Sequence, residues 1–197
     1  MADRIKLVMG TKDFNFIDKF IARWRLSKVI KQIKKGEAVL DFGCGSQGYF
    51  LKQISPVIKN GVGLDYEVRN EKIGNLKFAS FKFRDQLPFE KETFDKVVML
   101  AVLEHIELDK VKKLFDEYRR VLKKDGRIIL TTPTPKSKNI LECLAYLNII
   151  SRKEIKDHKK YYAKRDVAIL AKNSSLKLVG YRLFQLGLNS EAILVKN

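Results

Sequence analysis

The fold of this chain is decided by ten consecutive residues, Val39-Leu40-Asp41-Phe42-Gly43-Cys44-Gly45-Ser46-Gln47-Gly48. An apolar run ends at the first glycine, and a segment with helical spacing begins after the last one. Glycine lets a backbone approach a ligand closely, and the free N–H groups of the following helix face the ligand's polar end. The stretch therefore predicts a strand, a glycine turn and a helix that together hold a cofactor.

A second short apolar run, Gly61-Val62-Gly63-Leu64-Asp65, supports this interpretation. It ends in a carboxylate roughly 20 residues beyond the glycine turn, which is the spacing of a ribose-binding acid in a nucleotide fold. Such a carboxylate can accept hydrogen bonds from both ribose hydroxyls, in the crevice at the carboxyl ends of parallel strands. Asp65 is therefore predicted to bind the nucleoside part of the cofactor.

Apolar runs and helical spacing alternate along most of the chain. Strands are expected at 39–42, 61–65, 76–83, 95–100 and 128–130, then 177–184 and 191–195, with helices near 49–54, 111–122 and 167–171. This alternation predicts an α/β fold with a doubly wound, mostly parallel sheet between two helical layers. The short connection Gly187-Leu188-Asn189 permits only antiparallel pairing, so the sheet is expected to end in a C-terminal hairpin.

The length of 197 residues predicts a single domain over residues 1–197. Residues 1–35 carry a basic, amphipathic helical pattern that would cover one edge of the core. No apolar run is long enough to span a bilayer and the start does not resemble a signal peptide, so a cytoplasmic location is expected. Two cysteines, Cys44 and Cys143, and two histidines give no ligand spacing for a metal, and none is expected.

The formal charge of +17 identifies three classes of possible partner: nucleic acid, an anionic membrane surface or an acidic substrate. The lysines are spread along the whole chain, however, and no known nucleic-acid-binding motif accompanies them. Nucleic acid is thus possible as a partner but not favoured, and much of the charge is explained as solvated surface.

Taken together, the motifs resemble those of the class I S-adenosylmethionine-dependent methyltransferases, specifically the small single-domain group. The stretches that carry the resemblance are the glycine turn at 39–45, Gly-Leu-Asp at 63–65, Leu-Pro-Phe at 87–89, Phe-Asp-Lys-Val-Val at 94–98 and Val-Leu-Glu-His at 102–105. The resemblance implies a Rossmann-like, seven-stranded sheet with a reversed last strand, and S-adenosyl-L-methionine as the cofactor.

Carried over position by position, the resemblance places Asp41, Gly43 and Gly45 around the methionine end of the cofactor. Asp65 would bind the ribose and Tyr66 would flank the adenine. The family's usual acidic position near the adenine is occupied by a phenylalanine here, so Asp85 with Gln86 is the nearest substitute. The full set of expected cofactor residues is Asp41, Phe42, Gly43, Cys44, Gly45, Gly48, Asp65, Tyr66, Asp85, Gln86, Leu100 and Ala101.

Methyl transfer from an activated sulfonium depends mainly on positioning, so a base is needed only when the acceptor must lose a proton. The two histidines, His105 and His158, are the candidates because their ordinary pKa lies near neutrality. Residues 136–165 would form a lid or substrate-recognition insertion. Expected acceptor contacts are Arg23, Arg25, Tyr161 and Tyr162, with one of the arginines meeting either the acceptor or the cofactor carboxylate.

The predicted reaction is transfer of a methyl group to an oxygen or nitrogen of a small molecule, a glycan or a lipid precursor. Two other functions stay open. The spacing Gly-x-Gly-x-x-Gly is also that of an NAD(P)-binding Rossmann oxidoreductase, and the charge would suit a non-catalytic basic module that binds nucleic acid on the same fold. The sequence leaves the oligomeric state open.

Overall fold

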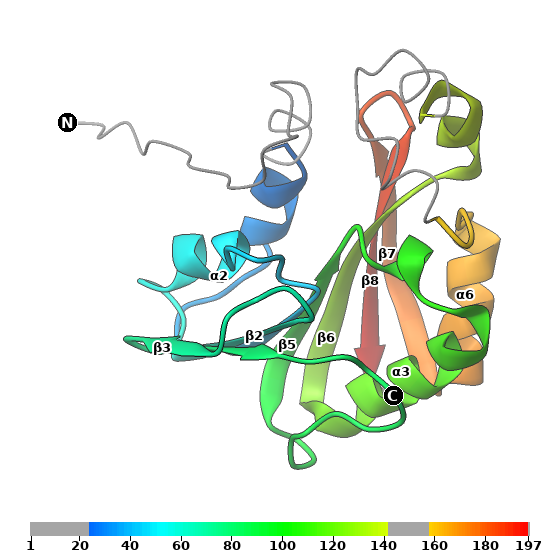
Figure 1. The fold of residues 1–197 in the computed structure, drawn as a ribbon. Coiled ribbons are helices and arrows are strands. Elements are labelled where there is room, and N and C mark those ends of the chain that lie inside the picture. The colour runs from blue at the N-terminus through cyan, green and yellow to red at the C-terminus, as the bar shows by residue number, and fades with distance from the viewer. Residues whose placement is uncertain (1–23, 142–157, 197) are drawn as a thin grey trace.

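The computed structural model describes residues 24–141 and 158–196, and these form one eight-stranded sheet with helices on both faces (Figure 1). Residues 24–30 are helical. The labelled elements are β1 Ala38–Phe42, α2 Tyr49–Ile54, β2 Asn60–Asp65, β3 Glu71–Ile73, β4 Leu76–Ser80, β5 Phe94–Leu100, η1 Leu103–His105, α3 Leu108–Val121, β6 Leu122–Pro133, η2 Pro135–Ser137, α6 Lys164–Asn173, β7 Leu176–Phe184 and β8 Asn189–Lys196.

The strand order is β3-β4-β2-β1-β5-β6-β8-β7. Strands β4, β2, β1, β5 and β6 pair in parallel, as the alternation of strands and helices predicts. All five residues of β1 are buried because the strand lies between β2 and β5 and has helices on both faces. This is why its sequence is a continuous apolar run interrupted only by Asp41.

Two apolar cores fill the space between the layers. One face of the sheet packs against residues 24–30 and α2, through side chains such as Val29 and Leu51. The opposite face packs against α3 and α6, through Leu114 and Val167 among others. In Figure 1 the blue helix and α2 accordingly lie apart from α3 and α6. The three-layer sandwich predicted from the sequence is confirmed.

The C-terminal hairpin is also confirmed. Strand β8 runs antiparallel to both β6 and β7. Residues 185–188 form the turn, in which Gln185, Leu186 and Gly187 all have positive φ. Within the described residues, no helix combines the length and the apolar character that crossing a bilayer requires.

The prediction of seven strands was wrong by one strand. The additional strand is β3, which pairs antiparallel with β4 at the edge of the sheet. Its three residues are all exposed, so the strand forms through backbone pairing and leaves no apolar pattern in the sequence.

Two predicted element boundaries were wrong as well. Strand β4 ends at Ser80, whereas the sequence predicted a strand through residue 83. Phe83 lies in a loop, and an apolar residue stands there because its ring packs edge-on against Phe42. The helix before β6 ends at Val121, and the strand begins at Leu122 instead of near residue 128.

The order of the strands fixes where a ligand can bind. Strand β1 pairs with two strands of the sheet. The chain continues from β1 to β2, which pairs along one side of β1, while β5 pairs along its other side. The connections that leave the carboxyl ends of β1 and β5 therefore diverge at this point. In open α/β sheets this reversal creates a crevice for ligands.

Candidate functional site

The glycine turn after β1 is built from left-handed backbone. Gly43, Gly45 and Gly48 have φ values of +78°, +68° and +55°. Residues other than glycine rarely adopt this backbone conformation because their Cβ atom crowds the backbone. The N–H groups of Gly43 and Cys44 both donate to the Leu64 carbonyl, at 2.7 and 3.2 Å, which ties the turn to the end of β2.

The three glycines differ in what surrounds them. A Cβ on Gly43 would lie 2.2 Å from a methyl group of Val102, and one on Gly48 would lie 2.0 Å from the ring of Phe78. A Cβ on Gly45 would meet no atom within 4 Å. Gly43 and Gly48 are therefore required for packing, while Gly45 faces open space where a ligand can approach the backbone.

Asp65 lies against this turn. Its Oδ2 accepts a hydrogen bond from the Gly45 N–H at 2.9 Å, and its Oδ1 accepts one from the Glu67 N–H at 2.9 Å. A carboxylate has about four acceptor positions, so two further hydrogen bonds remain possible. The structure thus brings together the glycine turn and the carboxylate that the sequence predicts as neighbours.

Asp41 lies one position before the end of β1 and is 2% exposed. Burial, and then the negative charge of Asp65, raise the pKa of the Asp41 carboxyl to about 8. The site therefore holds two nearby carboxyl groups, and the raised pKa of Asp41 favours its neutral form. A bound cation would favour ionisation of that group.

Of two other predicted cofactor residues, Phe42 is buried and Cys44 is partly buried. The Phe42 ring is buried and packs edge-on against Tyr118, with ring centroids 5.7 Å apart. Burial and the charges of Asp41 and Asp65 raise the pKa of the Cys44 thiol, so it stays protonated and is a poor nucleophile. Any cofactor contact of Phe42 is expected to come from its backbone.

The residues predicted near the adenine are exposed. Tyr66 directly follows β2 and is 72% exposed. Asp85 and Gln86 lie in an exposed loop, where Asp85 Oδ1 is 2.8 Å from Lys113 Nζ of α3. That hydrogen bond lowers the pKa of Asp85. The structure pairs Asp85 with α3, and its contact with the adenine stays a prediction.

Strand β5 is parallel to β1, so its carboxyl end, at Leu100, lies at the same end of the sheet as the glycine turn. Ala101 follows with φ of +55°, and its N–H donates to the Thr131 carbonyl of β6 at 2.9 Å. A left-handed conformation costs an alanine about 1–2 kcal/mol. Such strain is concentrated at functional sites, which agrees with a cofactor contact through this backbone.

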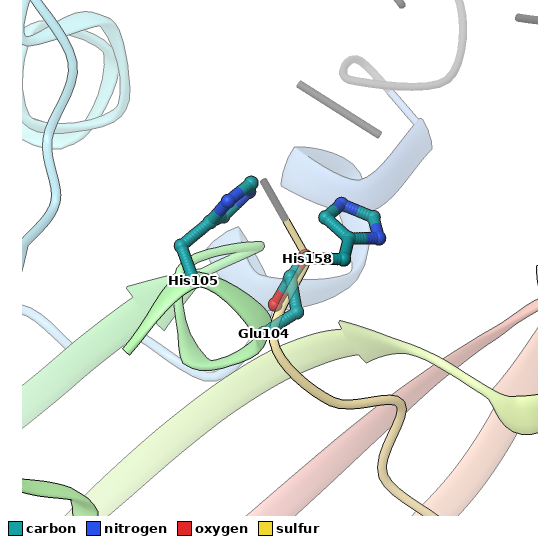
Figure 2. Close-up of side chains that lie close together, drawn as sticks. All are labelled: Glu104, His105 and His158. Carbon is teal, nitrogen blue, oxygen red and sulfur yellow. The ribbon is translucent and has the colours of Figure 1, made fainter. Parts of the chain in front are cut away.

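The two histidines, predicted independently, lie together. The ring centroids of His105 and His158 are 4.8 Å apart at an interplanar angle of 75°. His105 is the last residue of η1, while His158 belongs to the segment before α6 (Figure 2). The ring of Tyr161 packs against His158 at 5.2 Å.

Glu104 is a residue of this site that the sequence interpretation did not assign. It is 1% exposed, and its Oε2 accepts a hydrogen bond from the Thr132 hydroxyl at 3.1 Å. Burial raises its pKa to about 7, although the charge of Arg25 and the Thr132 hydroxyl act in the opposite direction. A carboxylate next to a histidine just after a buried strand was the available indication.

The predicted acceptor residues separate into distinct environments. Arg25 lies close enough to influence Glu104 electrostatically, and Tyr161 contacts His158. The Tyr162 ring is buried in the core shared with α3 and α6. Arg23 lies outside the described residues, as do residues 142–157 of the predicted insertion at 136–165 and residues 1–23 of the N-terminal segment.

The chain is similar to several known proteins. A family model described as a methyltransferase domain matches residues 11–180. Two uncharacterized proteins of Methanocaldococcus jannaschii are 39% identical over 108 residues and 33% identical over 129 residues. These matches cover 51% and 64% of the chain, and 39% and 52% of the relatives. The chain thus spans about half the length of these curated relatives or less.

Solved structures share the fold at low sequence identity. A S-adenosylmethionine-dependent methyltransferase from Mesorhizobium loti superposes with a TM-score of 0.68 at 14% identity, covering 89% of this chain and 98% of that one. One from Methanosarcina mazei gives 0.64 at 17% identity, with 86% and 96% covered. CalO1, a methyltransferase of calicheamicin biosynthesis solved with SAH bound, gives 0.68 at 16% identity, with 92% and 55% covered.

Proposed function

Because the chain belongs to the methyltransferase-domain family, we propose that it transfers a methyl group from S-adenosyl-L-methionine to an oxygen or nitrogen of an anionic or amphipathic acceptor. The observation that carries the proposal is the hydrogen bond between Asp65 and the Gly45 N–H, at the carboxyl ends of β1 and β2. This hydrogen bond places a carboxylate, which can accept hydrogen bonds from ribose hydroxyls, next to a glycine that faces open space.

In this proposal the chain's own residues hold and orient the cofactor. Asp65 accepts hydrogen bonds from the ribose hydroxyls with the acceptor positions that the backbone leaves free. Asp41 supplies negative charge near the methionine end, and the cofactor's positive charge favours its ionised form. Gly45 lets the cofactor lie directly on the backbone. Positioning of this kind contributes most of the rate in a displacement at an activated sulfonium.

The acceptor end is proposed to lie near η1. Val102, which lies against Gly43, directly precedes η1, and η1 contains Glu104 and His105. Arg25 and the two histidines are near Glu104, so the region offers cationic and hydrogen-bonding groups. These groups suit an acceptor that carries carboxylate or phosphate, such as a glycan or lipid precursor.

Transfer of tritium from methyl-labelled S-adenosylmethionine to fractions of a cell extract tests the reaction. We expect label in molecules that an anion-exchange resin retains. Gly45→Ala should abolish most of the transfer, whereas Gly74→Ala should not. Gly74 is the matched control because it also has positive φ, +56°, and no atom within 4 Å of its Cβ position. Equal transfer by the two variants would contradict the proposed cofactor position.

A second pair of variants tests the charge of the acceptor. Arg25→Ala should raise the acceptor concentration needed for half-maximal transfer without changing cofactor affinity. Lys31→Ala, which removes an exposed charge just after the same helix, should leave both unchanged. Label found only in molecules without negative charge would reject the anionic acceptor while leaving the methyl transfer intact.

A further inference from the structure

Glu104, His105 and His158 form a cluster that the cofactor turn does not use. Each side chain offers one oxygen or nitrogen atom, and these atoms lie within 4.8 Å of one another. Figure 2 shows Glu104 and His105 on η1 and His158 on a separate segment beside them. The cluster thus joins residues that are more than fifty positions apart in the chain.

Main-chain hydrogen bonds fix this arrangement. The Lys159 N–H donates to the Glu104 carbonyl at 2.6 Å, which ties the segment of His158 to η1. The His105 N–H donates to the Val102 carbonyl at 3.0 Å and closes the turn of η1. The backbones of the three residues are therefore held next to one another, whatever conformation their side chains adopt.

The geometry is close to that of a metal site. Imidazole nitrogens and carboxylate oxygens bind zinc at about 2.0–2.2 Å, so atoms in one coordination shell lie roughly 3–3.5 Å apart. The three atoms lie within 4.8 Å of one another, so side-chain movements of roughly 1 Å would bring them to that spacing. The Thr132 hydroxyl already donates to Glu104, as an outer-shell partner that orients a ligating carboxylate does.

We propose that Glu104, His105 and His158 bind a divalent transition-metal ion such as Zn²⁺, leaving coordination positions free for an oxygen of the acceptor. Binding of the metal is independent of the proposed function. Only its contact with the acceptor rests on methyl transfer. This proposal differs from the sequence-based expectations in two ways. From the sequence no metal was expected, and the two histidines were given the role of a base instead of that of metal ligands.

The ligand atoms of the site select the class of metal. Magnesium and calcium prefer several oxygen ligands, whereas this cluster has one carboxylate. Two imidazoles favour zinc, cobalt, nickel or iron, which bind nitrogen well. Two histidines and one carboxylate also form the three-ligand set of catalytic sites that keep a position open.

Calorimetric titration of the untagged, chelator-treated chain with ZnCl₂ tests this site, together with the visible absorption spectrum of the Co²⁺ form. We expect one ion per chain. His158→Ala and Glu104→Gln should weaken binding by more than about 100-fold, which exceeds the effect of losing an outer-shell partner. The matched control is Glu107→Gln, which removes an exposed carboxylate just after the same turn and outside the cluster.

The outcomes separate the metal site from the proposed function. Absence of Zn²⁺ binding, or equal affinity in His158→Ala and the unmodified chain, would overturn the metal site. Titration of the metal-free chain with S-adenosylmethionine reports on the cofactor turn alone. Neither variant is expected to misfold. His158→Ala changes a residue that is only partly buried, and Glu104→Gln preserves the size of the side chain.

Discussion

The glycine turn and the Glu104–His105–His158 cluster occupy the same edge of the sheet but are constructed in opposite ways. The turn is specified by one stretch of residues and is held by hydrogen bonds to the end of the adjacent strand. The cluster combines two segments that are joined by a main-chain hydrogen bond at Lys159 and by the contact between the two histidine rings. A locally specified site is visible in a sequence, whereas a site assembled by tertiary contacts requires the structure.

The largest expected effect tests how tightly the turn is packed. Gly43→Ala should destabilise the protein by roughly 2–5 kcal/mol, from strain of about 1–2 kcal/mol at positive φ and about 1–3 kcal/mol of overpacking against Val102. Urea denaturation measures the difference. Gly36→Ala has a similar φ, +81°, with open space around it, so it should lose only the strain energy. Similar losses in both variants would show that the contact with Val102 is not a constraint.

The next effect concerns the buried carboxyl of Asp41, near the end of β1. The pKa of Asp41 is raised in the folded chain, so folding binds a proton between about pH 4 and 8 and stability falls as the pH rises through that window. Asn cannot titrate. Asp41→Asn should therefore match the unmodified protein below pH 4 and become the more stable of the two as the pH rises toward 8.

Thermal unfolding of both proteins from pH 4 to 8 checks this expectation. The same variant should bind S-adenosylmethionine more weakly, because it lacks the charge that a cationic cofactor would induce. Parallel stability curves across that pH range would mean that Asp41 is not perturbed in the folded chain.

A comparable effect on binding is expected at Asp65. Asp65→Ala should weaken S-adenosylmethionine binding by about 1–3 kcal/mol, the usual cost of lost hydrogen bonds to a charged group. Glu67→Gln is the control, since it removes a neighbouring exposed carboxylate and keeps the backbone N–H that donates to Asp65. Isothermal titration calorimetry measures both affinities. An unchanged affinity in Asp65→Ala would remove this residue from the cofactor site.

The smallest effect tests the main-chain hydrogen bond that ties the segment of His158 to η1. Lys159→Pro removes the N–H that donates to Glu104, at a cost of about 1 kcal/mol. Lys159→Ala removes the side chain and keeps the N–H. Nuclear Overhauser contacts between the His105 and His158 rings should weaken in the proline variant and persist in the alanine variant. If they persist in both, the rings are held by other contacts.

The contrast explains which features the sequence could reveal. The glycine turn and the hairpin each depend on residues within a few positions of one another, and Asp65 ends an apolar run at a recognisable spacing from the turn, so all three were predicted. Strand β3 pairs through its backbone alone, so its three exposed residues gave no pattern. Phe83 was assigned to a strand because burial in a loop leaves the same apolar residue as burial in a sheet.

The candidate site was predicted unevenly for the same reason. Both histidines were selected for their chemistry, but their contact depends on how the segment before α6 returns to η1. Glu104 was overlooked because its position beside His105 is a weak indication, and its burial follows from tertiary packing. Asp85 was chosen by its position in the chain, and its pairing with Lys113 arises from the packing of α3.

The central claim is that the carboxyl ends of β1 and β2 hold an adenosyl cofactor bearing a positively charged sulfur. Parallel calorimetric titrations of the unmodified chain with S-adenosylmethionine and with NAD test it most directly. The account predicts saturable binding of S-adenosylmethionine at one site per chain and much weaker binding of NAD. Preference for NAD, or no binding of either compound, would contradict it.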